Sequence, residues 1–146
     1  VMLKKQIQPL LVMALMLPGM ACSNAKSTSS TPRGLYGTWA VSAQEIGGKT
    51  LPKAAFEKQQ LIIHDSIYTF IAESIDKGIV KITGDKMDIY SNEGVNAGRH
   101  FTAIYKHENG ILTICYNLRG DSYPEAFDTK EHPLFFLSVF NKAPAK

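Results

Sequence analysis

The sequence is poor in cysteine, which limits the covalent bonds that can hold its fold together. Among 146 residues only Cys22 and Cys115 are cysteines, so a scaffold held by several disulfides is excluded. Cys115 lies inside the apolar run 111–116. We therefore expect its thiol to be buried as a small hydrophobic group. The alternative is a reactive site, which needs an accessible thiolate.

A cluster of basic residues is also missing. The chain has 16 Lys and Arg against 13 Asp and Glu, and its formal net charge is +3. Lys4 and Lys5 belong to an N-terminal segment that we expect to be cleaved, and without them the charge falls to +1. Proteins that bind nucleic acid present a basic stripe. We therefore expect no nucleic-acid partner.

No hydrophobic run after residue 33 is long enough to cross a membrane as a helix. The N-terminal run 10–17 has eight residues, whereas a spanning helix needs about 20. Lys4 and Lys5 precede this run and Pro18-Gly19 follows it. A short apolar core with a positive start and a helix break is typical of a signal peptide. We predict that residues 1–21 are a signal peptide.

The residues at the expected cleavage point resemble the lipobox of bacterial lipoproteins. Gly19-Met20-Ala21-Cys22 places small residues before a cysteine, although Gly19 stands where leucine is usual. The resemblance implies that Cys22 is acylated and becomes the mature N-terminus, which leaves Cys115 without an intramolecular partner. The alternative is an ordinary secretory signal cut near Ala21, which would leave a free protein.

Residues 22–33 are expected to form a flexible tether from the lipidated cysteine. The segment 23–33 is polar and rich in Ser and Thr, and it shows no apolar periodicity. Such a chain has a root-mean-square reach of roughly 20 Å. Because several acyl chains anchor a protein firmly, we expect a lipid-anchored protein of the cell envelope that faces the periplasm. Ser23 after Cys22 resembles the sorting signal for the outer rather than the inner membrane.

Beyond the tether, hydrophobic residues alternate with a period of two, and turn residues interrupt them every eight to twelve positions. This spacing predicts an all-β sandwich or barrel. The segment 52–59 is the one good helical stretch. Eight strands are expected at 36–43, 60–64, 67–72, 78–83, 87–90, 100–106, 111–117 and 134–140.

We predict that these strands form an eight-stranded up-and-down antiparallel barrel with one short helix. In a small domain with short strands we expect the first and last strands to pair and close the sheet, because unpaired edge strands promote aggregation. Thr69, Thr102, Lys106 and Thr113 suit the outer face. The alternation predicts the following inward residues: Tyr68, Phe70, Phe101, Ala103, Tyr105, Leu112, Ile114 and Tyr116.

Gly37-Thr38-Trp39 resembles the G-x-W signature of the lipocalins and their relatives. With the later GKTLP, IYTF and LTICY segments, the chain resembles a lipocalin-like, calycin-type family of small exported bacterial domains, for which no reaction is established. The resemblance implies a barrel domain over 34–142, with 143–146 as a tail. It also implies that Trp39 closes the barrel floor against a basic residue. Lys142 matches this role, and Arg119 is the alternative.

No pattern in the chain predicts a catalytic, metal or cofactor site. The four histidines show no i, i+2 or i, i+4 ligand pair, so surface positions are expected for His64, His100, His107 and His132. The glycine-rich loop 94–98 lacks a following helix that would aim amides at a phosphate. We expect a protein that is not an enzyme.

Two functions remain open at this point. The first is a binding module whose barrel takes a small apolar or amphipathic ligand, with Tyr68, Phe70, Tyr105 and Tyr116 in the pocket wall. The second is a protein-interaction module, an enzyme inhibitor or envelope-assembly partner, that acts through the loop 118–133 with exposed Tyr123 and Phe127. A roomy interior favours the first function, and a filled interior favours the second.

Overall fold

The computed structural model describes residues 30–144. The predicted signal peptide, Cys22 and most of the predicted tether lie outside the described residues. Within the described part, no helix has the length and apolar character needed to cross a membrane. The two helical segments there are a 3-10 turn at Arg33–Leu35 and the single turn α1 at Lys53–Phe56.

The remaining elements are strands, which all pair in antiparallel fashion. They are β1 (Gly37–Ile46), β2 (Lys49–Thr50), β3 (Gln60–His64), β4 (Ile67–Ile71), β5 (Ile75–Thr83), β6 (Lys86–Glu93), β7 (His100–Glu108), β8 (Ile111–Asn117) and β9 (Phe135–Lys142).

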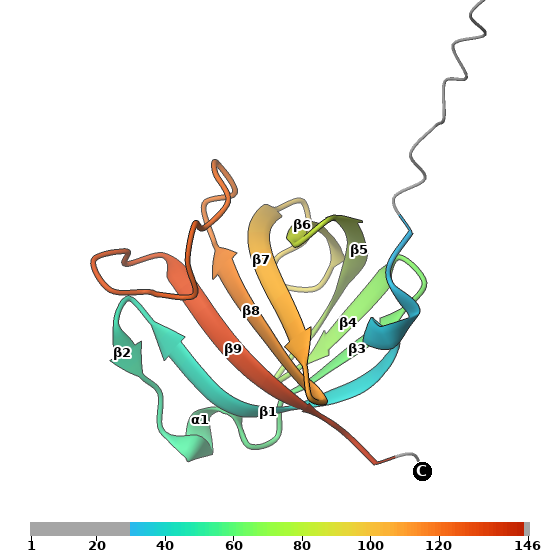
Figure 1. The fold of residues 1–146 in the computed structure, drawn as a ribbon, viewed down its shortest axis with the longest axis horizontal. Helices are drawn as coiled ribbons and strands as arrows, with labels where there is room; N and C mark the ends of the chain where they lie inside the picture. Colours follow the sequence, from blue (N-terminus) through green and yellow to red (C-terminus); the bar gives the residue numbers. More distant parts are fainter. Residues whose placement is uncertain (1–29, 145–146) are drawn as a thin grey trace, which may run out of the picture.

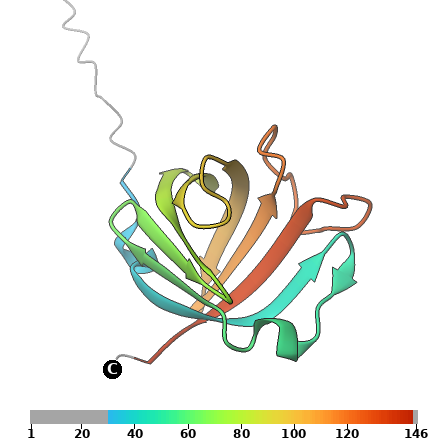
Figure 2. The ribbon, with the colours of Figure 1, turned by 180° about the vertical axis from the view of Figure 1, so that it is seen from behind.

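The predicted eight-stranded barrel is confirmed. Each strand from β3 to β8 pairs with the next one along the chain, β1 pairs with β3, and β9 returns to pair with β1. Figures 1 and 2 show the closed barrel from opposite sides, with β1 and β9 running side by side. The short β2, which was not predicted, adds to the end of β1 outside the closed ring. The helix is shorter than expected, because α1 ends at Phe56 and a turn at 57–58 leads into β3, which begins at Gln60 as predicted.

Alternating burial shows why these residues form a closed sheet. Along β5, exposed and buried residues alternate strictly, so one face of the strand lies inside the barrel. The turn between β7 and β8 has positive φ at both central residues, 52° at Asn109 and 75° at Gly110. This is the geometry of a two-residue hairpin turn, which the Asn-Gly sequence favours.

The up-and-down order gives the barrel two different ends. The β3–β4, β5–β6 and β7–β8 turns lie at one end, together with the start of β1 and the end of β9. We call this the closed end, because the fully buried Trp39 fills it and its indole N–H donates a 2.9 Å hydrogen bond to the carbonyl of Leu35 in the 3-10 turn. The β4–β5, β6–β7 and β8–β9 connections lie at the other end, the open end.

The connection from β8 to β9, the β8–β9 loop (118–134), covers part of the outer face. Thr102 and Thr113 lie on the outer face as expected, yet both are buried. The Thr102 hydroxyl donates to the carbonyl of Ser122 in this loop. Thr129 is fully buried, accepts a hydrogen bond from the Gly48 amide and donates to the Glu45 carboxylate.

Cys115 lies on the same outer face and is fully buried. Its strand neighbours Ile114 and Tyr116 point into the barrel, so the thiol itself points outward, beneath the covering loop. Burial raises the pKa of this thiol to about 11. The thiol is therefore protonated at neutral pH, and its environment is that of a packed structural cysteine.

Candidate functional site

The barrel interior is not filled. A cavity of about 290 Å³ extends from the middle of the barrel to the open end. Three of its lining residues are polar, namely Asp76, Asn96 and Arg99. The others are aliphatic or aromatic: Ile46, Leu61, Ile63, Tyr68, Phe70, Val80, Met87, Ile89, Phe101, Ile114, Tyr116, Leu118 and Phe136.

Three of the four predicted pocket residues line this cavity. Tyr68 and Phe70 come from β4, and Tyr116 comes from β8, where its ring centroid lies 6.0 Å from that of Phe136. Burial raises the pKa of Tyr116. The fourth predicted residue, Tyr105, is not among the lining residues. Its amide donates to the carbonyl of Asp85 in the β5–β6 turn, so Tyr105 lies nearer the closed end, against the core.

A buried carboxylate stands in the otherwise apolar wall. Asp76 of β5 is only 8% exposed and accepts two hydrogen bonds, one from the Tyr68 hydroxyl at 3.0 Å and one from the Ser91 hydroxyl at 2.6 Å. We call these three residues the Asp76 cluster. The pKa of Tyr68 is raised to about 12, mainly by burial, and the neighbouring Asp76 carboxylate adds to the effect. The cluster therefore gives the cavity one strongly polar spot.

An irregularity in the pairing of β5 with β6 places Ser91 against Asp76. Lys77 pairs with Glu93 but Gly78 pairs with Ser91, so β6 has one extra residue at this point. A Cβ atom on Gly78 would lie 1.9 Å from the carbonyl oxygen of Tyr90, so only glycine allows this close approach. Bulges of this kind re-aim side chains, and here the Ser91 hydroxyl reaches the Asp76 carboxylate.

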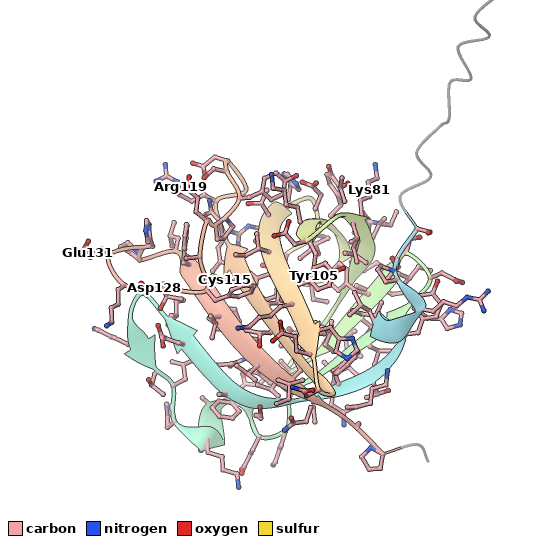
Figure 3. All side chains as sticks on the ribbon, viewed as in Figure 1. Lys81, Tyr105, Cys115, Arg119, Asp128 and Glu131 are labelled. Carbon is pink, nitrogen blue, oxygen red and sulfur yellow. The ribbon has the colours of Figure 1, made fainter. Side chains whose placement is uncertain are left out.

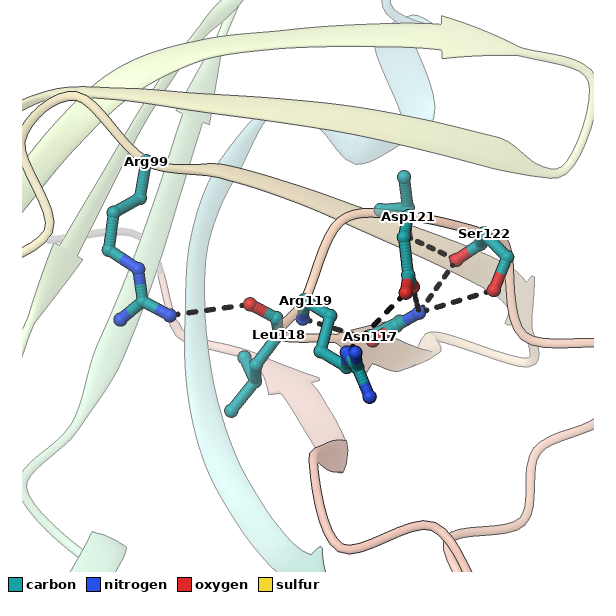
Figure 4. Close-up of polar contacts among 7 residues, drawn as sticks. Arg99, Asn117, Leu118, Arg119, Asp121 and Ser122 are labelled. Atoms are coloured by element: carbon teal, nitrogen blue, oxygen red, sulfur yellow. Dashed lines mark hydrogen bonds and ion pairs between the residues drawn. The ribbon is translucent and has the colours of Figure 1, made fainter.

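A second charged group lies at the rim of the open end. The Arg99 guanidinium donates to the Asn96 side-chain oxygen and to the Leu118 carbonyl, both at 3.3 Å, and it stacks 4.9 Å from the centroid of the Phe101 ring. Arg99 is exposed, and among the ion pairs of residues 30–144 none involves it. Figure 4 shows its side chain reaching the Leu118 carbonyl.

The Leu118 carbonyl is held in place by its neighbour Asn117. The Asn117 side-chain amide donates to the Asp121 carboxylate at 2.8 Å and to the Ser122 carbonyl at 3.0 Å, and its oxygen accepts the Arg119 amide at 3.0 Å (Figure 4). The hydrogen bond from Asn117 lowers the pKa of Asp121. These contacts fix the start of the β8–β9 loop, and with it one wall of the rim.

The two residues predicted to form the barrel floor lie together at the closed end. The Lys142 ammonium lies 4.4 Å from the centroid of the Trp39 ring and donates to the Tyr36 carbonyl. Arg119, the alternative partner, lies in the β8–β9 loop at the open end (Figure 3) and pairs with Asp121 at 3.4 Å. The floor therefore seals the end of the barrel opposite the cavity mouth.

The loop predicted as an interaction surface is less open than the sequence suggested. Tyr123 is half-buried, and its hydroxyl donates to Asp88 at 2.5 Å. His100, expected at the surface, is also half-buried and lies 2.8 Å from the other Asp88 oxygen. Phe127 is 36% exposed, with the Lys106 ammonium 4.8 Å from its ring centroid.

Sequence reasoning did not single out Asp76 or Arg99. The signal for Asp76 was present, because counting back by twos from the inward Val80 reaches Gly78 and then Asp76. The predicted strand began only at residue 78, since Asp is rare in strands. Arg99 follows a glycine-rich loop. The alternation of residues predicts side-chain orientation only within strands, so it gave no prediction for this residue.

Comparison with known proteins adds little to this site. No family model matches the chain, and no curated protein matches it. Among solved structures, a variant of the fluorescent protein UnaG is 14% identical, with a TM-score of 0.41, over 77% of this chain and 98% of that chain. Such a similarity says nothing of function. The described residues form the closed antiparallel barrel that the sequence resemblance implied.

Proposed function

We propose that this protein is a membrane-tethered binding module that takes a small amphipathic ligand into its barrel cavity. The observation that carries the proposal is the cavity itself, which has a mostly apolar, aromatic wall and a few polar groups that include Asp76 and Arg99. Pockets for small molecules have this composition, in which apolar area supplies affinity and isolated polar groups fix orientation.

The size and the position of the cavity limit the ligand. A volume of about 290 Å³ holds roughly ten non-hydrogen atoms, because a water molecule occupies about 30 Å³ in the liquid. Trp39 and Lys142 seal the closed end, so the ligand enters through the open end. The cavity favours ligand binding over the alternative, a solid barrel that recognises a protein partner through the β8–β9 loop.

The predicted tether is part of the proposed function, because it sets where the barrel lies relative to the membrane. Acylation at Cys22 holds the barrel within roughly 20 Å of the membrane surface, on the periplasmic side of the envelope and on the outer membrane. A module there meets amphipathic molecules that partition into the bilayer. Cys22→Ser is expected to abolish the incorporation of labelled palmitate, and a wild-type protein that takes up no palmitate would refute the anchor.

A matched pair of substitutions on β5 tests binding in the cavity. Val80 lines the cavity and is 3% exposed, whereas its neighbour Ile79 points outward and is 39% exposed. Val80→Phe fills the cavity, so it should weaken binding at least tenfold, and Ile79→Phe should leave binding unchanged. The measurement is calorimetric titration with octanol, octylamine and octanoate.

The protein for this titration is the chain from Ser23 onward, which contains the whole closed barrel and its core. Circular dichroism with a cooperative thermal transition checks that both variants are folded. The proposal fails when none of the three probes binds the unmodified protein. It fails also when Val80→Phe, folded, binds the probes as tightly as Ile79→Phe does.

A further inference from the structure

The Asp76 carboxylate lacks a counter-charge within the described part of the chain. None of the ion pairs of residues 30–144 involves Asp76, and its two hydrogen-bond donors are the neutral hydroxyls of Tyr68 and Ser91. A carboxylate has about four acceptor positions, so two remain. Asp76 is itself a lining residue, and a molecule in the cavity can therefore reach its carboxylate.

A buried carboxylate that lacks a counter-charge favours the binding of a cation. Removing an ionised group from water is costly unless it is both paired and hydrogen-bonded. The cluster supplies the hydrogen bonds, and the pairing charge is missing. Arg99 does not supply it, because its guanidinium lies at the exposed rim and is directed to Asn96 and Leu118.

The donor set suits an organic ammonium better than a metal ion. Hard divalent cations take six to eight oxygen ligands, whereas this cluster offers one carboxylate and two hydroxyls. Among residues 30–144 no group of three or more His, Cys, Asp or Glu side chains lies close enough to hold a metal. The aromatic walls from Tyr68, Phe70 and Tyr116 add favourable faces for a cation and for an apolar body.

From this geometry we infer that the ligand is a small hydrophobic amine, whose ammonium group pairs with Asp76 while its apolar body fills the rest of the cavity. The inference rests on the proposed function and names the ligand class. Alkyl amines are protonated at neutral pH, as the lysine side chain is. Molecules with a carboxylate head are repelled by the negative charge of Asp76, so their binding inside the cavity is disfavoured.

Three probes with the same eight-carbon chain test the inference. Octylamine is cationic, octanol is neutral and octanoate is anionic, and each has about the number of atoms that the cavity holds. In calorimetric titrations at pH 7, octylamine should bind at least tenfold more tightly than octanol, and octanoate should bind most weakly. A hydrogen bond to a charged group has about this effect on affinity.

Asp76→Asn keeps the size of the side chain and removes its charge. It should weaken octylamine binding about tenfold or more and change octanol binding by less than about twofold. Asp85→Asn is the matched control, because Asp85 lies in the exposed β5–β6 turn at the closed end, outside the cavity. Removal of that charge should leave the preference for octylamine intact.

The outcomes separate this inference from the proposed function. If octylamine and octanol bind equally well to the unmodified protein, the inference is overturned and the binding module stands. The same holds if folded Asp76→Asn keeps the preference for the amine. If no probe binds at all, the proposed function itself fails. Should Asp76→Asn not fold, the ratio of the two affinities in the unmodified protein decides alone.

Discussion

Lys142 is the residue whose removal best separates the stability of the barrel from ligand binding. Its ammonium lies over the Trp39 ring and donates to the Tyr36 carbonyl, all at the closed end. A cation–π contact at an exposed site contributes about 0.5–1 kcal/mol. Lys142→Met should therefore lower the free energy of unfolding by about 1 kcal/mol, measured by urea denaturation, and should leave probe binding unchanged.

Lys49→Met is the control for this prediction. Lys49 is exposed on β2, and its replacement by Met removes the same positive charge. The midpoint of its urea denaturation should equal that of the unmodified protein. Equal midpoints for the two variants would show that the Trp39 contact does not stabilise the barrel. A loss of probe binding in Lys142→Met would show that the closed end is coupled to the cavity.

Strand β5 shows how far the alternation of residues predicts an element and where it stops. The pattern predicted a strand at 78–83, and in the structure its apolar Val80 and Ile82 are buried at every second position. It missed residues 75–77 of the strand, where Asp76 takes the inward position. Because a charged residue lowers strand propensity, the propensity of the segment did not indicate that Asp76 belongs to the strand.

The β8–β9 loop shows a different limit. The sequence predicted a loop over 118–133, but it did not predict the contacts that this loop makes. Thr129 bonds to Glu45 and Gly48, more than eighty positions earlier in the chain. No local pattern encodes a pairing over such a separation. For the same reason the sequence indicated an exposed Tyr123, which is in fact bonded to Asp88.

At the scale of the whole molecule, the closed barrel was predictable and the cavity was not. Short strands with tight turns give an up-and-down order, and the cost of open edges then predicts the β1–β9 closure. Cavity volume is the small difference between the space enclosed and the volume of the side chains. Since an eight-stranded barrel is either filled or just able to hold one small ligand, composition alone cannot decide between the two.

The central claim is that a small ligand binds inside the barrel near its open end. Amide chemical shifts recorded during titration with the tightest-binding eight-carbon probe test it most directly. We predict large shifts at Phe70, Ser91 and Leu118 and small ones at Leu35 and the Trp39 indole. Shifts confined to the outer face of the β8–β9 loop, or no shifts at all, would contradict the account.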